Sequence, residues 1–218
     1  MNNQKQLGQN RPSTADTPET IYTVPAGTQA TNMLMYVCNQ SGSASTYSVY
    51  QDDTGSGSGT TTVLHFDVSI AANETVLLQI PPMSTENGII TVAAGDNNAL
   101  TFTLGGMEVT DPAHKILGQA FLADTTATTI YTVPANTTAI GLILSIVNQD
   151  SSAATYRVYQ DDDGDALGSS NHVAWEIAIS ANSRQQLSLL PMNNSGGVVG
   201  VRASSGNIMC FTLAGTEL

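Results

Sequence analysis

The sequence contains an internal duplication, and this feature constrains the fold more than any other. When Ile21–Val109 is laid on Ile130–Leu218 at an offset of 109 residues without a gap, 36 of 89 positions are identical. The hexapeptide IYTVPA, for example, starts at both Ile21 and Ile130. A period of this length is too long for a solenoid repeat and has the size of one small domain. The sequence therefore predicts two homologous domains in tandem.

A second, shorter match places the start of each unit. Lys5–Gln9 (KQLGQ) resembles Lys115–Gln119 (KILGQ) at an offset of 110, which implies one inserted residue. Pro112 is expected to stiffen the connection between the units. The expected segments are an extended arm at residues 1–18, domain 1 at 19–110, a linker at 111–115 and domain 2 at 116–218.

The arm is expected because domain 1 departs from domain 2 at its first segment. Domain 2 opens with an apolar, strand-like run at Leu117–Leu122, whereas domain 1 has Asn10 and Arg11 in place of the apolar pair. Pro12 follows and cannot donate to a strand ladder. Residues 1–18 are therefore expected to extend over a neighbouring surface, with a frayed tail as the alternative.

Each unit consists of short β-branched and aromatic runs separated by turn clusters about every ten residues, a spacing typical of sandwiches and barrels. No segment of ten or more residues shows a helical apolar period. The sequence predicts an all-β fold of two antiparallel β-sandwich domains, jelly-roll or immunoglobulin-like. In domain 1 the expected strands are Thr20–Val24, Thr31–Asn39, Thr46–Gln51, Val63–Ile70, Glu74–Ile80, Gly88–Ala93 and Leu100–Val109.

Composition excludes several classes of function. Only 11% of the residues are charged, against roughly a quarter in an average protein, and the net charge is −12. A protein that neutralises phosphates needs the opposite balance, so nucleic-acid binding is disfavoured. The sequence shows neither a secretory leader nor an apolar run long enough for a membrane helix, so a soluble protein made in a cytosol is expected. Cys38 and Cys210 are expected to be buried small hydrophobes rather than a disulfide.

No catalytic constellation is visible, and the sequence predicts a protein that is not an enzyme. His65, His114 and His172 occupy inequivalent repeat positions, and none lies at metal-pair spacing with another His or Cys. No nucleophile elbow, zinc-protease motif, phosphate loop or dinucleotide fingerprint occurs. The glycine-rich run at 55–59 lacks the lysine and helix of a phosphate loop and predicts a flexible hairpin.

One acidic loop has the composition of a calcium site. Asp161, Asp163 and Asp165 are alternate carboxylates that could coordinate Ca²⁺. The partner loop in domain 1 keeps only two carboxylates, and the glycine is misplaced for a helix-loop-helix calcium motif. A solvated acidic loop is therefore the main expectation, with Ca²⁺ as the alternative and no other cofactor expected.

The aromatic residues allow two interpretations. Trp175, which aligns with Phe66, could offer a sugar-stacking platform together with a set of repeat-equivalent tyrosines. Because these residues recur at equivalent positions of alternating strands, packing in the core or on a sheet face is favoured. The tyrosines in question are Tyr47, Tyr50, Tyr156 and Tyr159.

The motifs resemble a family of small β-sandwich proteins encoded among the structural genes of tailed bacteriophages. The resemblance rests on the LGQ start of each unit, on IYTVPA, and on the strand ends at Asn39 and Asn148. It covers nearly all of both units and implies an accessory virion component at the particle exterior. It transfers no known site residues.

The expected function is a non-enzymatic virion structural protein, most simply a capsid decoration or cement protein that binds the major capsid protein across shell subunits. A symmetric homo-oligomer is expected. Lys5 and Arg11 are the only bases before Lys115, so they are expected to let the arm seek acidic surface on the shell or on an adjacent copy. The alternatives are a tail or head–tail accessory protein (a collar, adaptor or fibre base) and a carbohydrate-binding receptor module.

Overall fold

All regular structure in the described residues is β-strand, because short alternating apolar runs are separated by glycine, asparagine and proline turns. The computed structural model describes residues 4–83, 87–110, 114–162, 164, 167–193 and 195–218. The chain divides into two units, Met1–Lys115 and Ile116–Leu218. They are called domain 1 and domain 2 below. No helix in the described residues is long and apolar enough to cross a membrane.

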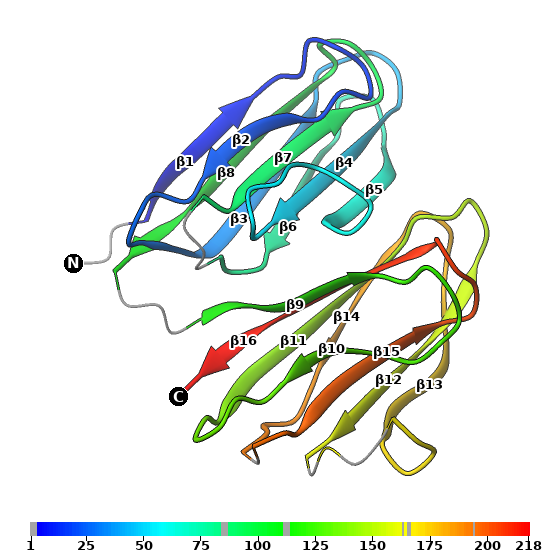
Figure 1. Ribbon diagram of the computed structural model, residues 1–218. Helices are drawn as coiled ribbons and strands as arrows, with labels where there is room; N and C mark the ends of the chain where they lie inside the picture. Colours follow the sequence, from blue (N-terminus) through cyan, green and yellow to red (C-terminus); the bar gives the residue numbers. More distant parts are fainter. Residues whose placement is uncertain (1–3, 84–86, 111–113, 163, 165–166, 194) are drawn as a thin grey trace. The chain divides into compact units, whose positions relative to one another are not determined.

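Each unit contains eight strands, drawn as arrows in Figure 1. In domain 1 they are β1 (Lys5–Asn10), β2 (Glu19–Thr23), β3 (Gln29–Asn39), β4 (Ser45–Asp52), β5 (Val63–Ile70), β6 (Thr75–Ile80), β7 (Ile89–Ala94) and β8 (Leu100–Val109). In domain 2 they are β9 (His114–Phe121), β10 (Thr128–Thr132), β11 (Ala139–Asn148), β12 (Ala154–Asp161), β13 (His172–Ile179), β14 (Arg184–Ser188), β15 (Val198–Ala203) and β16 (Met209–Glu217). The seven strands predicted for domain 1 all form, with ends that differ by at most two residues.

The strand pairing makes each unit a jelly roll. The two sheets of domain 1 have the orders β1-β8-β3-β6 and β2-β7-β4-β5, and those of domain 2 have the orders β9-β16-β11-β14 and β10-β15-β12-β13. In each unit the first strand pairs with the last and the second with the second-last, down to the central hairpin. This is a long antiparallel hairpin rolled into two sheets. Of the two topologies left open by the sequence, the immunoglobulin-like one does not occur.

The core of each domain lies between its two sheets, where alternate strand residues point inward. The largest fully buried side chains include Phe102 in domain 1 and the equivalent Phe211 in domain 2. Cys38 is half-buried and Cys210 is buried, both on strands.

The LGQ motif at the start of each unit has a structural role. A Cβ atom at Gly8 or Gly118 would overlap the backbone carbonyl oxygen of Ile21 or Ile130, so the close approach of the first strand to the second requires glycine. The following glutamine Nε2 donates to a threonine Oγ1 on the last strand, at 2.9 Å in domain 1 and 3.1 Å in domain 2. The LGQ signature therefore encodes the closure of the roll.

The buried asparagines Asn39 and Asn148 close a turn in the same way in both domains. Each Nδ2 donates to three backbone carbonyl oxygens, over distances of 2.8–3.5 Å. Each side chain is at most 1% exposed. A buried carbonyl group without a hydrogen-bond donor is costly. The asparagine amide therefore supplies the hydrogen bonds that water would otherwise donate to the three carbonyl groups.

Two predicted segments are corrected by the strand pairing. Residues 5–10 do not form an arm, because they are β1 and pair with β8 of the same domain. The strand ends at Asn10, before Pro12, so the missing proline donor does not interrupt the ladder. Of the predicted linker, His114 and Lys115 already belong to β9, and residues 111–113 lie outside the described residues.

Candidate functional site

The outer face of the sheet β10-β15-β12-β13 carries a β-bulge that places two side chains against one arginine. On β13, Ala174 pairs with Val158 and Ile177 with Tyr156, so Trp175 and Glu176 together oppose Arg157 on β12. Glu176 has a left-handed backbone with φ of 48°. A glutamate adopts this conformation only at a cost, and such strain together with a bulge often marks a site where a side chain is re-aimed.

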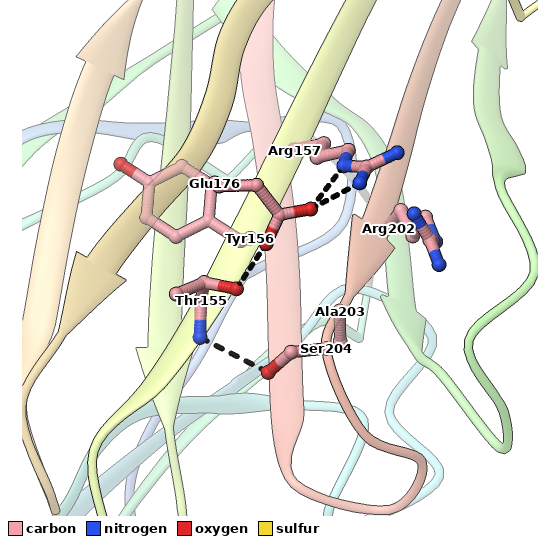
Figure 2. Close-up of a pocket in the computed structure, with 7 residues that line it drawn as sticks. All are labelled: Thr155, Tyr156, Arg157, Glu176, Arg202, Ala203 and Ser204. Atoms are coloured by element: carbon pink, nitrogen blue, oxygen red, sulfur yellow. Dashed lines mark hydrogen bonds and ion pairs between the residues drawn. The ribbon is translucent and has the colours of Figure 1, made fainter.

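The bulge holds the guanidinium of Arg157 from two sides. Its central carbon lies 3.6 Å from the centroid of the Trp175 ring, in cation–π contact. Arg157 also forms an ion pair with Glu176 Oε1, while Thr155 Oγ1 donates to Glu176 Oε2 at 2.6 Å (Figure 2). The Thr155 hydrogen bond, followed by the one from Arg157, lowers the pKa of Glu176 below its ordinary value. The carboxylate therefore stays ionised beside the arginine.

A second arginine lies directly across the sheet. Arg202 on β15 is the register partner of Arg157, so the two side chains share the outer face. Its Nε donates to the Thr125 carbonyl oxygen at 2.6 Å. Ser204 Oγ accepts a 3.0 Å hydrogen bond from the Thr155 backbone N–H. A hollow of about 170 Å³ lies among these side chains, lined by Thr155, Tyr156, Arg157, Glu176, Arg202, Ala203 and Ser204 (Figure 2).

A row of ring contacts extends the site along the same face. The Trp175 ring meets the His172 ring edge-on with 4.4 Å between centroids, and His172 lies 4.4 Å from the Tyr159 ring. Trp175 is nevertheless 53% exposed. Tyr47, Tyr156 and Tyr159 are buried and Tyr50 is half-buried, as expected of packing residues. Trp175 is the exposed aromatic ring that a sugar platform would require.

The equivalent face of domain 1 keeps the bulge and loses the cations. Ser48, Phe66, Asp67 and Ala93 stand where domain 2 has Arg157, Trp175, Glu176 and Arg202. Asp67 has the same left-handed backbone, with φ of 45°, and its N–H donates to Ser48 Oγ at 3.1 Å. The backbone geometry is thus a property of the repeat, and the charged cluster is specific to domain 2.

Domain 1 has a different candidate surface, on the outer face of the sheet β1-β8-β3-β6. Leu34, Tyr36 and Leu77 are 40–52% exposed there. Tyr36 and Leu77 are direct cross-strand partners, and Leu34 precedes Tyr36 by two residues on the same face. The cross-strand partners Gln79 and Gly105 of Leu34 are uncharged. These three residues are called the apolar patch below.

Domain 2 replaces the apolar patch by polar residues. Ser145 and Gln186 occupy the positions of Tyr36 and Leu77. Ser145 is buried, and its Oγ accepts a 2.7 Å hydrogen bond from Arg184 Nε. Only Ile143, equivalent to Leu34, remains an exposed apolar side chain on β11.

The two bases predicted to work from an arm are engaged within domain 1. Lys5 Nζ lies 2.6 Å from Glu108 Oε2, and Arg11 donates to the Asn98 carbonyl oxygen. The two side chains thus bind opposite ends of β8, Lys5 at its C-terminal end and Arg11 just before its N-terminal end. Residues 5–10 form a strand rather than an arm, and a contact of Lys5 and Arg11 with a partner surface stays a prediction.

The acidic loop is described only in part. Asp161 is 4% exposed at the end of β12, whereas Asp163 and Asp165 lie outside the described residues. In domain 1 the equivalent of Asp161 is Asp52, whose Oδ2 accepts from the Gly57 N–H at 2.7 Å and whose Oδ1 accepts from Thr54. Within the described part of the chain, no group of three His, Cys, Asp or Glu side chains could hold a metal ion. Calcium binding stays a prediction for calorimetric titration.

One feature of the sequence, the difference in charge between the two copies, points to the arginine cluster. Three of the six Lys and Arg residues lie in domain 2, and two of these three replace Ser48 and Ala93 of the other copy. Comparing the copies for gained positive charge, rather than for shared motifs, selects Arg157 and Arg202, together with Arg184, which replaces Thr75. The proximity of Arg157 and Arg202 depends on the register of strands 45 residues apart, which the sequence alone does not specify.

No protein-family model matches the chain, and no curated protein matches it. Among solved structures, the major capsid protein of bacteriophage PM2 aligns over 100% of this chain and 98% of its own, with 9% identity and a TM-score of 0.46. The CBM22-1-CBM22-2 tandem domain of Paenibacillus barcinonensis aligns over 95% of this chain and 86% of its own (10% identity, TM-score 0.32). A chain of Sulfolobus turreted icosahedral virus aligns over 99% of this chain and 59% of its own (13%, 0.32). All three TM-scores lie below 0.5.

Proposed function

We propose that the chain is a non-enzymatic structural protein of a bacteriophage virion, a decoration or cement protein that binds the major capsid protein from the particle exterior. The apolar patch of domain 1 carries this proposal. Exposed apolar groups that adjoin one another on a protein of net charge −12 favour contact with another protein. The resemblance of the LGQ and IYTVPA motifs to phage accessory proteins supplies the virion context.

The fold supports this function in physical terms. A jelly roll closes its first strand on its last, and each domain has its own buried core, which suits a protein exposed on a particle. The low share of cations keeps free nucleic acid and other acidic particles away. Jelly rolls also serve in lectins and enzymes, so the assignment rests on the surfaces rather than on the fold.

Copy number in purified particles tests the proposal. Quantitative mass spectrometry should find the chain in hundreds of copies per particle, in fixed proportion to the major capsid protein. About six or twelve copies would instead support the alternative of a tail, collar or head–tail accessory protein. Absence from gradient-purified particles would overturn both.

Two substitutions borrowed from domain 2 test the apolar patch. Tyr36→Ser and Leu77→Gln give domain 1 the residues of Ser145 and Gln186, and should reduce occupancy on particles that lack the wild-type protein by tenfold or more. Because the two side chains are about half exposed, the melting temperature should change little. Ile143→Ser in domain 2 is the matched control and should leave occupancy unchanged. Full occupancy of a folded double variant would contradict the assignment of this face.

A second function, carbohydrate binding, is favoured by one observation in domain 2. Trp175 is an exposed aromatic ring that stacks on Arg157, and Arg157 also lines the polar hollow. A receptor-binding module and a decoration protein can be the same molecule, with one domain for each task. A glycan array probed with the full chain separates them, since a purely structural protein binds no glycan.

A further inference from the structure

The arginine pair of domain 2 violates a local rule of sheet stability. Arg157 and Arg202 are direct cross-strand partners, an arrangement in which like charges repel. The chain has only six Lys and Arg residues in 218, and it places two of them opposite each other. Positions that break such a rule without a structural benefit are where functional sites are expected.

The other bases with described contacts serve their own domains. Lys5 pairs with Glu108, Arg11 with the Asn98 carbonyl oxygen, and Arg184 with Ser145. Arg202 differs, because only its Nε is seen bonded within the described residues, to the Thr125 carbonyl oxygen. Arg202 lines the hollow, and the two terminal nitrogens of a guanidinium group carry further N–H donors that suit a partner.

The neighbouring groups are held in place before any ligand arrives. Arg157 is fixed between the Trp175 ring and the Glu176 carboxylate. Glu176 is in turn fixed by Thr155 and by the strained bulge. Fixed side chains lose little entropy when a ligand binds, which raises affinity without new contacts. The local sum of charge over the two arginines and the glutamate is positive, on an acidic chain.

The mixture of donors and acceptors defines the ligand. Arg202 offers a planar pair of N–H donors, a geometry that fits a carboxylate, and the Ser204 hydroxyl can donate beside it. The Glu176 carboxylate accepts hydrogen bonds and repels a purely anionic group. A ligand that satisfies both carries an anionic group and hydrogen-bond donors together, as a sugar acid does with its carboxylate and hydroxyl groups. The hollow of about 170 Å³ is smaller than the roughly 300–1,000 Å³ of drug-sized pockets, which suits a single ring.

We propose that the hollow between Thr155, Arg202 and Ser204 binds an acidic sugar, a uronic-acid or sialic-acid residue, with its carboxylate on Arg202 and a hydroxyl group on Glu176. This inference deepens the second candidate function, carbohydrate binding, and rests on it. A single open site on one domain gives weak binding, on the order of 1 mM for a monosaccharide. Many copies on one particle would raise the effective affinity for a glycan-coated surface.

The single tryptophan makes the site directly observable. Trp175 is the only tryptophan of the chain and touches Arg157, so its fluorescence reports domain 2 alone. The full chain is titrated with glucuronate, N-acetylneuraminate, glucose and acetate. Glucose differs from glucuronate only at the carboxylate carbon, and acetate supplies the carboxylate without the ring. The proposal is supported if Trp175 fluorescence changes saturably with the two acidic sugars and if glucose and acetate bind at least tenfold more weakly.

Two variants and one control assign the response to the hollow. Arg202→Gln should weaken glucuronate binding at least tenfold, since a hydrogen bond to a charged group is lost. Ser204→Ala, a milder change, should weaken it a few-fold. Lys5→Gln removes the same charge in domain 1 and should leave the titration unchanged. Circular dichroism melts establish that each variant is folded before it is scored.

Four results would overturn the acidic-sugar site. They are no response to any acidic sugar, equal responses to glucose and glucuronate, unchanged binding by a folded Arg202→Gln protein, and acetate binding as tight as glucuronate. The last would mean a site for a bare carboxylate, such as an acidic side chain of a second copy. If neutral glycans bind on the array while acidic sugars do not, carbohydrate binding survives and this ligand class fails. Particle copy number tests the virion proposal separately.

Discussion

Domains 1 and 2 share a backbone design and differ in what their outer faces carry. The glycine contacts, the buried asparagines and the bulge in β5 and β13 recur in both copies. The outer faces diverge in opposite directions. Domain 1 has gained an uncharged apolar patch, and domain 2 has gained an arginine pair beside an exposed tryptophan.

This contrast separates residues that maintain the roll from residues that act on other molecules. A residue identical in both copies, such as Asn39 and Asn148, satisfies a requirement of the fold. A residue that changes charge or polarity between copies, such as Ser48 and Arg157, is not needed for the fold and can serve a function. Duplication followed by divergence of the outer faces gives one chain two different surfaces on one type of scaffold.

Replacing the glycine at the start of each roll should give the largest loss of stability. Gly118→Ala places a methyl group on the Ile130 carbonyl oxygen, and Gly8→Ala does the same at Ile21. Because backbone rather than a side chain must move, we expect a loss of about 3 kcal/mol or more in each domain. In thermal unfolding of the full chain, Gly118→Ala should lower the transition followed by Trp175 fluorescence. Gly8→Ala should lower only a separate calorimetric transition. Equal shifts of the Trp175 transition would mean that the two units unfold as one.

Replacing the buried asparagines should give the next largest loss of stability, and the loss should be equal in the two domains. Asn39→Ala and Asn148→Ala each remove a buried amide donor that three backbone carbonyl groups share, which we expect to cost about 2–3 kcal/mol. Asn→Asp at the same positions preserves shape and the acceptor oxygen and should destabilise as well, because the amide donor is lost. Chemical denaturation measures both pairs. A cost confined to one domain would break the structural equivalence of the copies.

The bulge should show the difference between the copies most directly. Arg157→Ala removes an ion pair and a cation–π contact at a partly exposed position, which we expect to cost about 1 kcal/mol. It should also shift the Trp175 emission toward that of a solvated indole. Ser48→Ala, the matched change in domain 1, should alter stability by no more than about 0.5 kcal/mol. A double-mutant cycle with Trp175→Leu measures the Arg157–Trp175 coupling, and a coupling of zero would refute the contact.

The strands and the duplication could be predicted from the sequence because both are local or repeated patterns. Alternation in Val63–Ile70 and the turn residues around it depend on a few neighbouring residues. The first strand of domain 1 escapes prediction because Pro12 suggests an interruption, whereas the strand ends at Asn10, with Gln9 paired to Thr103 before the proline. The choice of jelly roll depends on pairing between the two ends of a unit, which no local pattern encodes.

The candidate site could not be predicted because it depends on register and on one extra residue in a strand. Arg157 and Arg202 meet only if β12 and β15 pair in this register. Trp175 and Glu176 face the same arginine only because the bulge cancels the alternation of a strand. The repeat-equivalent position of Trp175 therefore predicts packing in the core or on a sheet face, although the ring is half exposed.

Titration of Glu176 should give the smallest effect and tests how the bulge is held. Its pKa is lowered from 4.5, first by the Thr155 hydrogen bond and then by Arg157. A carboxyl group with a depressed native pKa stabilises the fold above its unfolded value, and this stabilisation is lost as the pH falls from about 4.5 through the lowered pKa. The ¹³C carboxyl resonance of labelled Glu176 should therefore titrate below 4.5. Thr155→Val and Arg157→Gln should each raise the midpoint, because both side chains lower the pKa of Glu176. The control is His172→Gln, at the ring that contacts Trp175. This variant should leave the midpoint of the Glu176 carboxyl group unchanged. A Glu176 midpoint at or above 4.5 would mean that the carboxylate is not held by the bulge, and that Arg157 is positioned by Trp175 alone.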